Sequence, residues 1–101
     1  MAGVRIFEVG DFYSTAVKSE FDGDISICVH EREADGSYPL CIGEMPLIVV
    51  ERLSWGVQER DDRIGDFAYE AVAKRGGTKG ERLAMGFRTA EYVGAAIDAL
   101  S

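Results

Sequence analysis

Two cysteines and a histidine lie within one short segment, CVHEREADGSYPLC, residues 28–41. Thiolate and imidazole are preferred ligands of Zn²⁺, and a thiol beside an imidazole can act as a nucleophile with its base. Cys28, His30 and Cys41 therefore suggest a metal site, a catalytic pair or a disulfide. To choose among them we consider the strand geometry, because Asp35-Gly36 is typical of the tight turn of a β-hairpin.

The predicted hairpin disfavours all three kinds of site. Pairing around the turn places His30 opposite Cys41 and leaves Cys28 one step diagonally away. A diagonal cross-strand pair lies ~7 Å apart, whereas the Cβ atoms of a disulfide lie ~3.8 Å apart. A structural zinc site takes four ligands, and the sequence has no further cysteine or histidine. No orienting group accompanies a Cys–His pair. We therefore predict free thiols, no metal and no cofactor.

Size and charge limit the classes of function. A chain of 101 residues can form one core, so we expect a single domain over residues 1–101. Its 18 acidic and 11 basic residues give a formal charge of −7. This charge repels nucleic acid and anionic membranes but attracts a protein partner with a basic surface. The sequence has no signal-peptide pattern and no apolar run that could span a bilayer, which predicts a cytoplasmic protein with reduced thiols.

The hydrophobic pattern changes along the chain from period two to a helical period. The first half predicts strands at residues 3–9, 12–19, 25–33, 38–43 and 47–55. The second half predicts a helix over 61–75, a short strand over 83–87 and a helix that begins at Thr89. We therefore expect an α+β fold, in which an antiparallel β-meander of about five strands has two C-terminal helices packed on one face.

Strand register predicts which side chains share the helix-covered face. The expected turns pair Val4 with Val17, Val17 with Val29 and Val29 with Ile42, which makes one apolar face. Beyond its apolar part, the same face gathers carboxylates and aromatic rings, which form the predicted binding rim: Glu8, Tyr13, Glu31, Glu33, Tyr38, Glu51 and Trp55. Carboxylates at this density suit cation binding or acid–base chemistry. A solvated strand end is the alternative interpretation.

The opposite face of the predicted sheet is too apolar for a fully solvated surface. A second copy of the chain could cover it and give a two-fold homodimer. The alternative is that residues 56–61 or the termini fold over this face. The predicted dimer interface consists of Phe7, Phe12, His30, Cys41, Ile48 and Val50.

These patterns predict a non-enzymatic protein–protein interaction module that presents an acidic and aromatic surface. The absence of a nucleophile–base set makes an enzyme the less favoured interpretation. The small size and acidity suit an accessory protein of a mobile element, or an inhibitor that occupies a basic surface. The alternative function is a small-ligand or cation-binding protein. Its pocket would lie between sheet and helices, with weak acid–base chemistry from Tyr13, Glu31, Tyr38 and Glu51.

Overall fold

The computed structural model describes residues 2–35, 38–52 and 56–101; for residues 2 and 50–52 it describes the backbone alone. The elements in chain order are β1 (Ala2–Val9), β2 (Phe12–Lys18), β3 (Ile25–Glu31), β4 (Leu40–Pro46), α1 (Leu47–Arg52), α2 (Val57–Lys74) and α3 (Lys79–Leu100). The four strands form one antiparallel sheet in sequential order. This confirms the α+β class and the antiparallel sheet.

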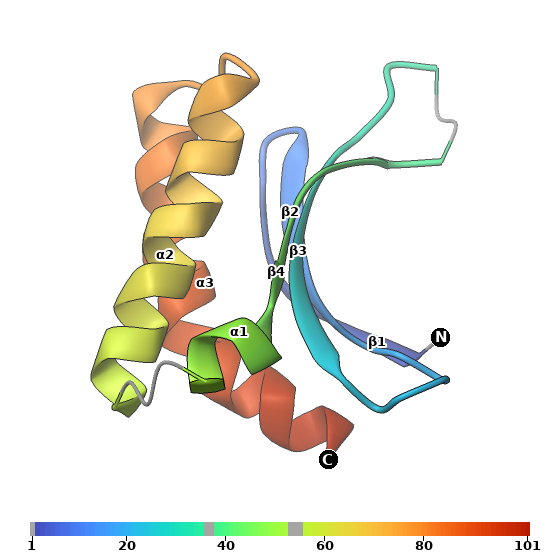
Figure 1. Ribbon diagram of the computed structural model, residues 1–101. Coiled ribbons are helices and arrows are strands. Elements are labelled where there is room, and N and C mark those ends of the chain that lie inside the picture. Colours follow the sequence, from blue (N-terminus) through green and yellow to red (C-terminus); the bar gives the residue numbers. More distant parts are fainter. Residues whose placement is uncertain (1, 36–37, 53–55) are drawn as a thin grey trace.

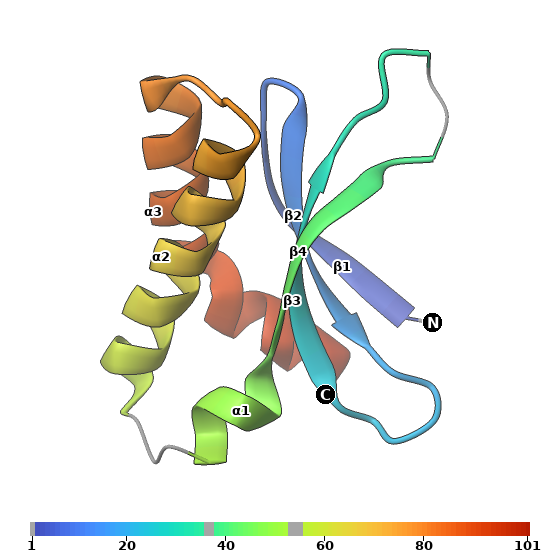
Figure 2. The ribbon, with the colours of Figure 1, turned by 45° about the horizontal axis from the view of Figure 1, so that its top comes forward.

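The two long helices lie on the same side of the sheet, as Figures 1 and 2 show. α3 packs mainly on β1 and β2, and α2 packs on β3 and β4. Two apolar clusters fill the space between the layers. Their buried members are Phe12, Val29, Ala68, Ala71, Val72 and Met85 in one cluster, and Ala16, Ile27, Leu47, Ile64, Val93 and Ala96 in the other.

The segment predicted as a fifth strand is helical instead, so the prediction of a strand over 47–55 is wrong. β4 ends at Pro46 and α1 begins at the next residue. Proline has no N–H group with which to continue a ladder, and it is tolerated at the start of a helix. Leu47 then turns into the core, where it is buried. Residues 53–55 lie outside the described part of the chain.

α3 begins at Lys79, ten residues before the predicted Thr89, and it replaces both the predicted strand over 83–87 and the shorter helix. Thr78 starts it with a capping box: the Thr78 hydroxyl accepts a hydrogen bond from Glu81 N at 3.2 Å, and the Glu81 carboxylate accepts one from Thr78 N at 2.8 Å. Thr89 lies in the middle of α3, where its hydroxyl donates to Ser14 Oγ at 2.9 Å.

The pairing of β2 with β3 differs from the predicted register. Val17 pairs with Ser26 and Ser14 pairs with Val29, whereas we expected Val17 opposite Val29. The connection spans residues 19–24 and is closed by a hydrogen bond from Ser19 N to Asp24 O, where the prediction had a three-residue loop. An odd shift of three residues turns every side chain of β2 to the other face.

Bulges account for the remaining register differences. In β1 the pairing shifts between Arg5 and Phe7, so Val4 pairs with Ala16 and not with Val17. In β4 it shifts after Cys41, so Val29 pairs with Gly43 instead of Ile42. The predicted opposition of His30 and Cys41 is confirmed.

Candidate functional site

The described members of the predicted binding rim do not form one surface, because the reversal of β2 places them on different faces of the sheet. Glu8 and Tyr13 pair across β1 and β2 on the face turned away from the helices. Glu31 lies in register with Phe12 on the helix side, where its carboxylate accepts a hydrogen bond from Arg75 Nε at 2.6 Å. Glu33 and Tyr38 are exposed in the connection between β3 and β4. The Glu51 side chain and Trp55 lie outside the described residues.

The same separation affects the acid–base set of the alternative function. Tyr13 and Glu31 lie on opposite faces of the sheet. Glu51 belongs to α1, which follows the end of β4 that pairs with the start of β3, so its backbone lies at the other end of the sheet from Glu31. The described side chains of Tyr13 and Glu31 therefore do not converge on one pocket between sheet and helices.

The predicted dimer interface is also divided. Phe12 is a buried core residue and Phe7 packs against its cluster, because both face the helices. His30 and Cys41 lie on the opposite face of the sheet. Ile48 belongs to α1, and the Val50 side chain lies outside the described residues. The described side chains among the six therefore do not share a surface, and the homodimer stays a prediction.

The sheet face turned away from the helices carries a layer of stacked side chains, and we call it the uncovered face. The Tyr13 and His30 rings stack with centroids 4.7 Å apart. The Arg5 guanidinium lies 4.4 Å above the centre of the Tyr13 ring, and the Glu8 carboxylate accepts from both Arg5 and Arg32. Tyr13 is consequently only 6% exposed. The Glu8 carboxylate offsets one of the two arginine charges, and the arginine side chains shield the ring.

A pocket of about 450 Å³ lies beside this layer on the uncovered face, and Cys28, His30 and Glu44 help to line it. Burial raises the pKa of Cys28 to about 12, and the neighbouring Cys41 and Glu44 make smaller contributions in the same direction. Burial also lowers the pKa of His30, and the positive charge of Arg5 lowers it further. The Cys28 thiol is therefore protonated at neutral pH and is a poor nucleophile.

Both cysteines are free. Within residues 2–35, 38–52 and 56–101, no three or more His, Cys, Asp and Glu side chains are grouped as a metal site. The described helices include none with the length and apolar character needed to cross a bilayer.

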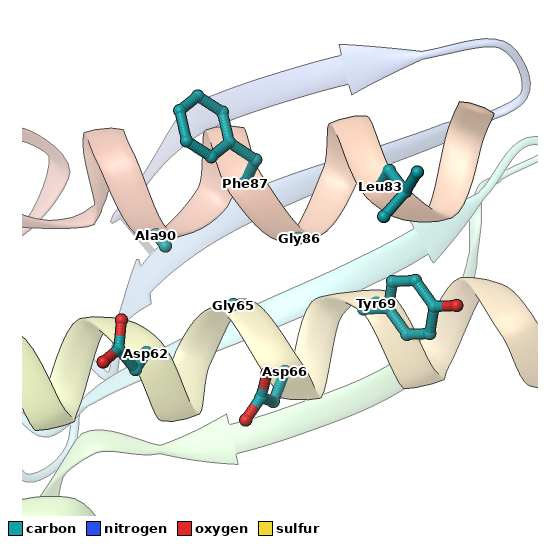
Figure 3. A pocket seen from close by; sticks show the side chains of 8 residues that line it. All are labelled: Asp62, Gly65, Asp66, Tyr69, Leu83, Gly86, Phe87 and Ala90. Atoms are coloured by element: carbon teal, nitrogen blue, oxygen red, sulfur yellow. The ribbon is translucent and has the colours of Figure 1, made fainter. Parts of the chain in front are cut away.

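A groove runs between α2 and α3 on the surface of the helical layer, and we call it the α2–α3 groove. Figure 3 shows its lining residues: Asp62, Gly65, Asp66, Tyr69, Leu83, Gly86, Phe87 and Ala90. Its volume is about 510 Å³. The two helices approach closely at its floor, because a Cβ atom added to Gly65 would lie 2.9 Å from the Gly86 oxygen, and one added to Gly86 would lie 2.9 Å from the Gly65 oxygen.

The two sides of the α2–α3 groove differ in chemistry. The α3 side exposes apolar side chains, since Leu83 is 52% exposed and Phe87 is 65% exposed; the Arg88 guanidinium lies 5.4 Å from the centre of the Phe87 ring. The α2 side carries two exposed carboxylates, Asp62 and Asp66. The Asp62 carboxylate accepts a hydrogen bond from the neutral Gln58 amide at 3.0 Å, and the Asp66 carboxylate has neither a hydrogen bond nor an ion pair with the described residues. Both charges are therefore available to a cation from outside.

A smaller hollow of about 320 Å³ continues the groove, and it shares Asp62, Phe87 and Ala90 with the larger one. Its other acidic residues are already paired: Asp61 with Arg60 at 2.8 Å, and Glu91 with Arg88 at 2.6 Å. Phe87 thus lines both hollows, as does Asp62.

Sequence reasoning missed this groove because the alternation of Leu83, Met85 and Phe87 also fits a strand. The available signal was helical spacing: Leu83, Phe87 and Ala90 follow an i, i+4, i+7 pattern, as do Asp62, Asp66 and Tyr69. Comparisons with protein families, with curated proteins and with solved structures find no match to this chain.

Proposed function

We propose that this protein is a non-enzymatic interaction module that binds a protein partner with a basic surface at the α2–α3 groove. The observation that carries the proposal is Phe87, a largely exposed aromatic side chain that lines two adjoining hollows, of which the larger is also lined by the carboxylates of Asp62 and Asp66. Aromatic side chains that become buried on association contribute a large part of the binding energy at protein interfaces.

Electrostatics supports the same kind of partner. The net charge of −7 steers a basic protein toward the molecule. At the groove, we expect Asp62 and Asp66 to meet lysine or arginine of the partner. Such rim charges act mainly on the association rate and on its salt dependence, while the apolar anchor governs dissociation. A basic surface that otherwise binds nucleic acid is one class of partner that this module would block.

The uncovered face supports the non-enzymatic part of the proposal. Its thiol at Cys28 is buried and protonated at neutral pH. His30 is engaged in stacking on Tyr13 and lies 3.0 Å from the Thr15 hydroxyl through its Nε2 atom. The Tyr13 ring is shielded. This arrangement stabilises a surface and does not activate a nucleophile.

The proposal can be tested by selecting random displayed peptides against the protein and measuring the affinity of the enriched ones. We expect these peptides to combine aromatic or aliphatic residues with lysine or arginine. Phe87→Ala and Asp66→Lys should each weaken binding at least tenfold. The matched controls are Phe21→Ala, at a fully exposed ring in the β2–β3 turn, and Asp98→Lys, at an exposed carboxylate of α3. Equal effects of groove and control variants would reject the groove as the binding surface.

A further inference from the structure

We infer that the segment bound in the α2–α3 groove is an amphipathic α-helix of the partner, with basic side chains along one flank. The inference rests on the proposed function and adds the conformation and the residue pattern of the partner. It follows from the backbone chemistry of the groove, from the spacing of its lining residues and from the difference between its two sides.

The walls of the groove offer no backbone groups to an incoming segment. Gly65, Asp66, Gly86 and Phe87 lie inside long helices, whose backbone N–H and C=O groups bond within the helix. An extended segment buried here would have backbone groups with no partner, and each such group costs free energy. A helix satisfies its own backbone hydrogen bonds and presents side chains alone, so it suits this groove.

The spacing of the lining residues matches a helix laid along the groove. On α2 the lining residues Asp62, Asp66 and Tyr69 span seven positions, and on α3 Leu83, Phe87 and Ala90 do the same. At 1.5 Å per residue each side is ~10.5 Å long, or about two helical turns. An added helix of two to three turns would contact both sides, with its axis roughly along theirs.

The two sides of the groove fix the pattern of the partner helix. Leu83 and Phe87 call for apolar residues at positions i, i+4 and i+7, which lie on one stripe. Asp62 and Asp66 call for lysine or arginine on the neighbouring flank, for example at i+1 and i+5, which lie ~100° and ~140° around the helix from position i. An acidic or uncharged helix with the same apolar stripe would lack this electrostatic match.

The test uses a synthetic peptide of about 14 residues, with leucine at i, i+4 and i+7 and lysine at i+1 and i+5; at this length an isolated helix is only marginally stable in water. Its binding to the full chain should be accompanied by a gain in peptide helicity, measured by circular dichroism. A peptide of equal charge with a central proline should bind at least tenfold more weakly, because proline breaks the helix. Phe87→Ala should weaken the parent peptide at least tenfold, while Phe21→Ala should not.

The possible outcomes separate the inference from the function on which it rests. If the proline peptide binds as well as the parent and Phe87→Ala still weakens both, the bound segment is not helical; the inference fails and the proposed function stands. If Phe87→Ala has no effect on any peptide, or no peptide binds, both fail. If light scattering shows a dimer of the free protein that Phe87→Ala dissociates, the groove binds a second copy, which also overturns the inference.

Discussion

The close approach of α2 and α3 gives a prediction that can be worked out from the structure. A Cβ atom at position 86 would lie 2.9 Å from the Gly65 oxygen and 3.1 Å from Tyr69 Cβ, whereas carbon atoms pack best at ~3.5–4.0 Å. Gly86→Ala must therefore push the helices apart by several tenths of an ångström. Gly94 lies in the same helix, but an added Cβ there would lie 3.7 Å from Arg60 Nη2, which is an ordinary contact.

Two opposing effects determine the magnitude. Replacing a helix-interior glycine by alanine stabilises a helix by ~0.8–1.0 kcal/mol. Overpacking a closely fitted site costs ~1–3 kcal/mol. Gly94→Ala should show the helix stabilisation alone, whereas Gly86→Ala should show both the helix stabilisation and the cost of overpacking. The free energy of unfolding of Gly86→Ala should therefore be ~1–3 kcal/mol below that of Gly94→Ala.

The measurement is urea unfolding followed by circular dichroism, with thermal unfolding as a second readout. Since 1 kcal/mol corresponds to ~4–8 °C in a domain of this size, the Tm of Gly86→Ala should lie at least ~4 °C below that of Gly94→Ala. Gly65→Ala should lower the free energy of unfolding less in the Gly86→Ala background than it does alone. The reason is that one separation of the two helices removes the steric clash at both positions. Equal stability of Gly86→Ala and Gly94→Ala would refute the close approach.

Three further predictions concern the helix cap, the buried thiol and the groove. Thr78→Ala should lower the free energy of unfolding by ~0.5–2 kcal/mol in urea titrations, because it removes the hydroxyl that accepts from Glu81 N; an unchanged midpoint would contradict the capping box. Because the pKa of Cys28 is raised to about 12 in the folded protein, the unfolded state loses this proton first. The contribution of the Cys28 thiol to the free energy of unfolding should therefore be complete below about pH 8.5, the pKa of an ordinary thiol. Between that pH and pH 12, this contribution should decrease by at most ~1.4 kcal/mol per pH unit. Unfolding measured across this range should show the decline weakened in Cys28→Ser but not in Cys41→Ser, and identical profiles would contradict it. Phe87→Ala should change the free energy of unfolding by less than ~0.5 kcal/mol, since its ring is mostly in solvent; a loss above ~2 kcal/mol would mean that Phe87 belongs to the core.

The hairpin of β3 and β4 was predictable because local chemistry specifies it. The predicted register and the apolar alternation of β3 placed His30 opposite Cys41 and Ile27 on the helix side, as the structure has them, whereas Gly36 of the predicted turn lies outside the described residues. The connection between β2 and β3 has no comparable signal. The Asp22 carboxylate accepts from Asp24 N at 2.9 Å, and Gly23 has a positive φ of 75°, so six residues close a loop that we expected to need three. That difference alone reverses β2.

The second half of the chain was harder to predict because two periods coexist in it. Leu83, Met85 and Phe87 alternate as in a strand, yet in the structure only Met85 is buried, and it continues helically through Thr89 and Val93. The Thr78-x-x-Glu81 pattern was the local signal that favoured a helix. The groove itself could not be predicted from local sequence, because it depends on two glycines that meet across separate helices.

The most direct measurement is the backbone amide spectrum of ¹⁵N-labelled protein during titration with the lysine–leucine peptide. Binding at the α2–α3 groove should shift the resonances of Asp66, Leu83, Phe87 and Ala90 and leave that of His30 unchanged. Shifts confined to the uncovered face, around His30, Cys28 and Glu44, would contradict the assignment of partner binding to the helical layer.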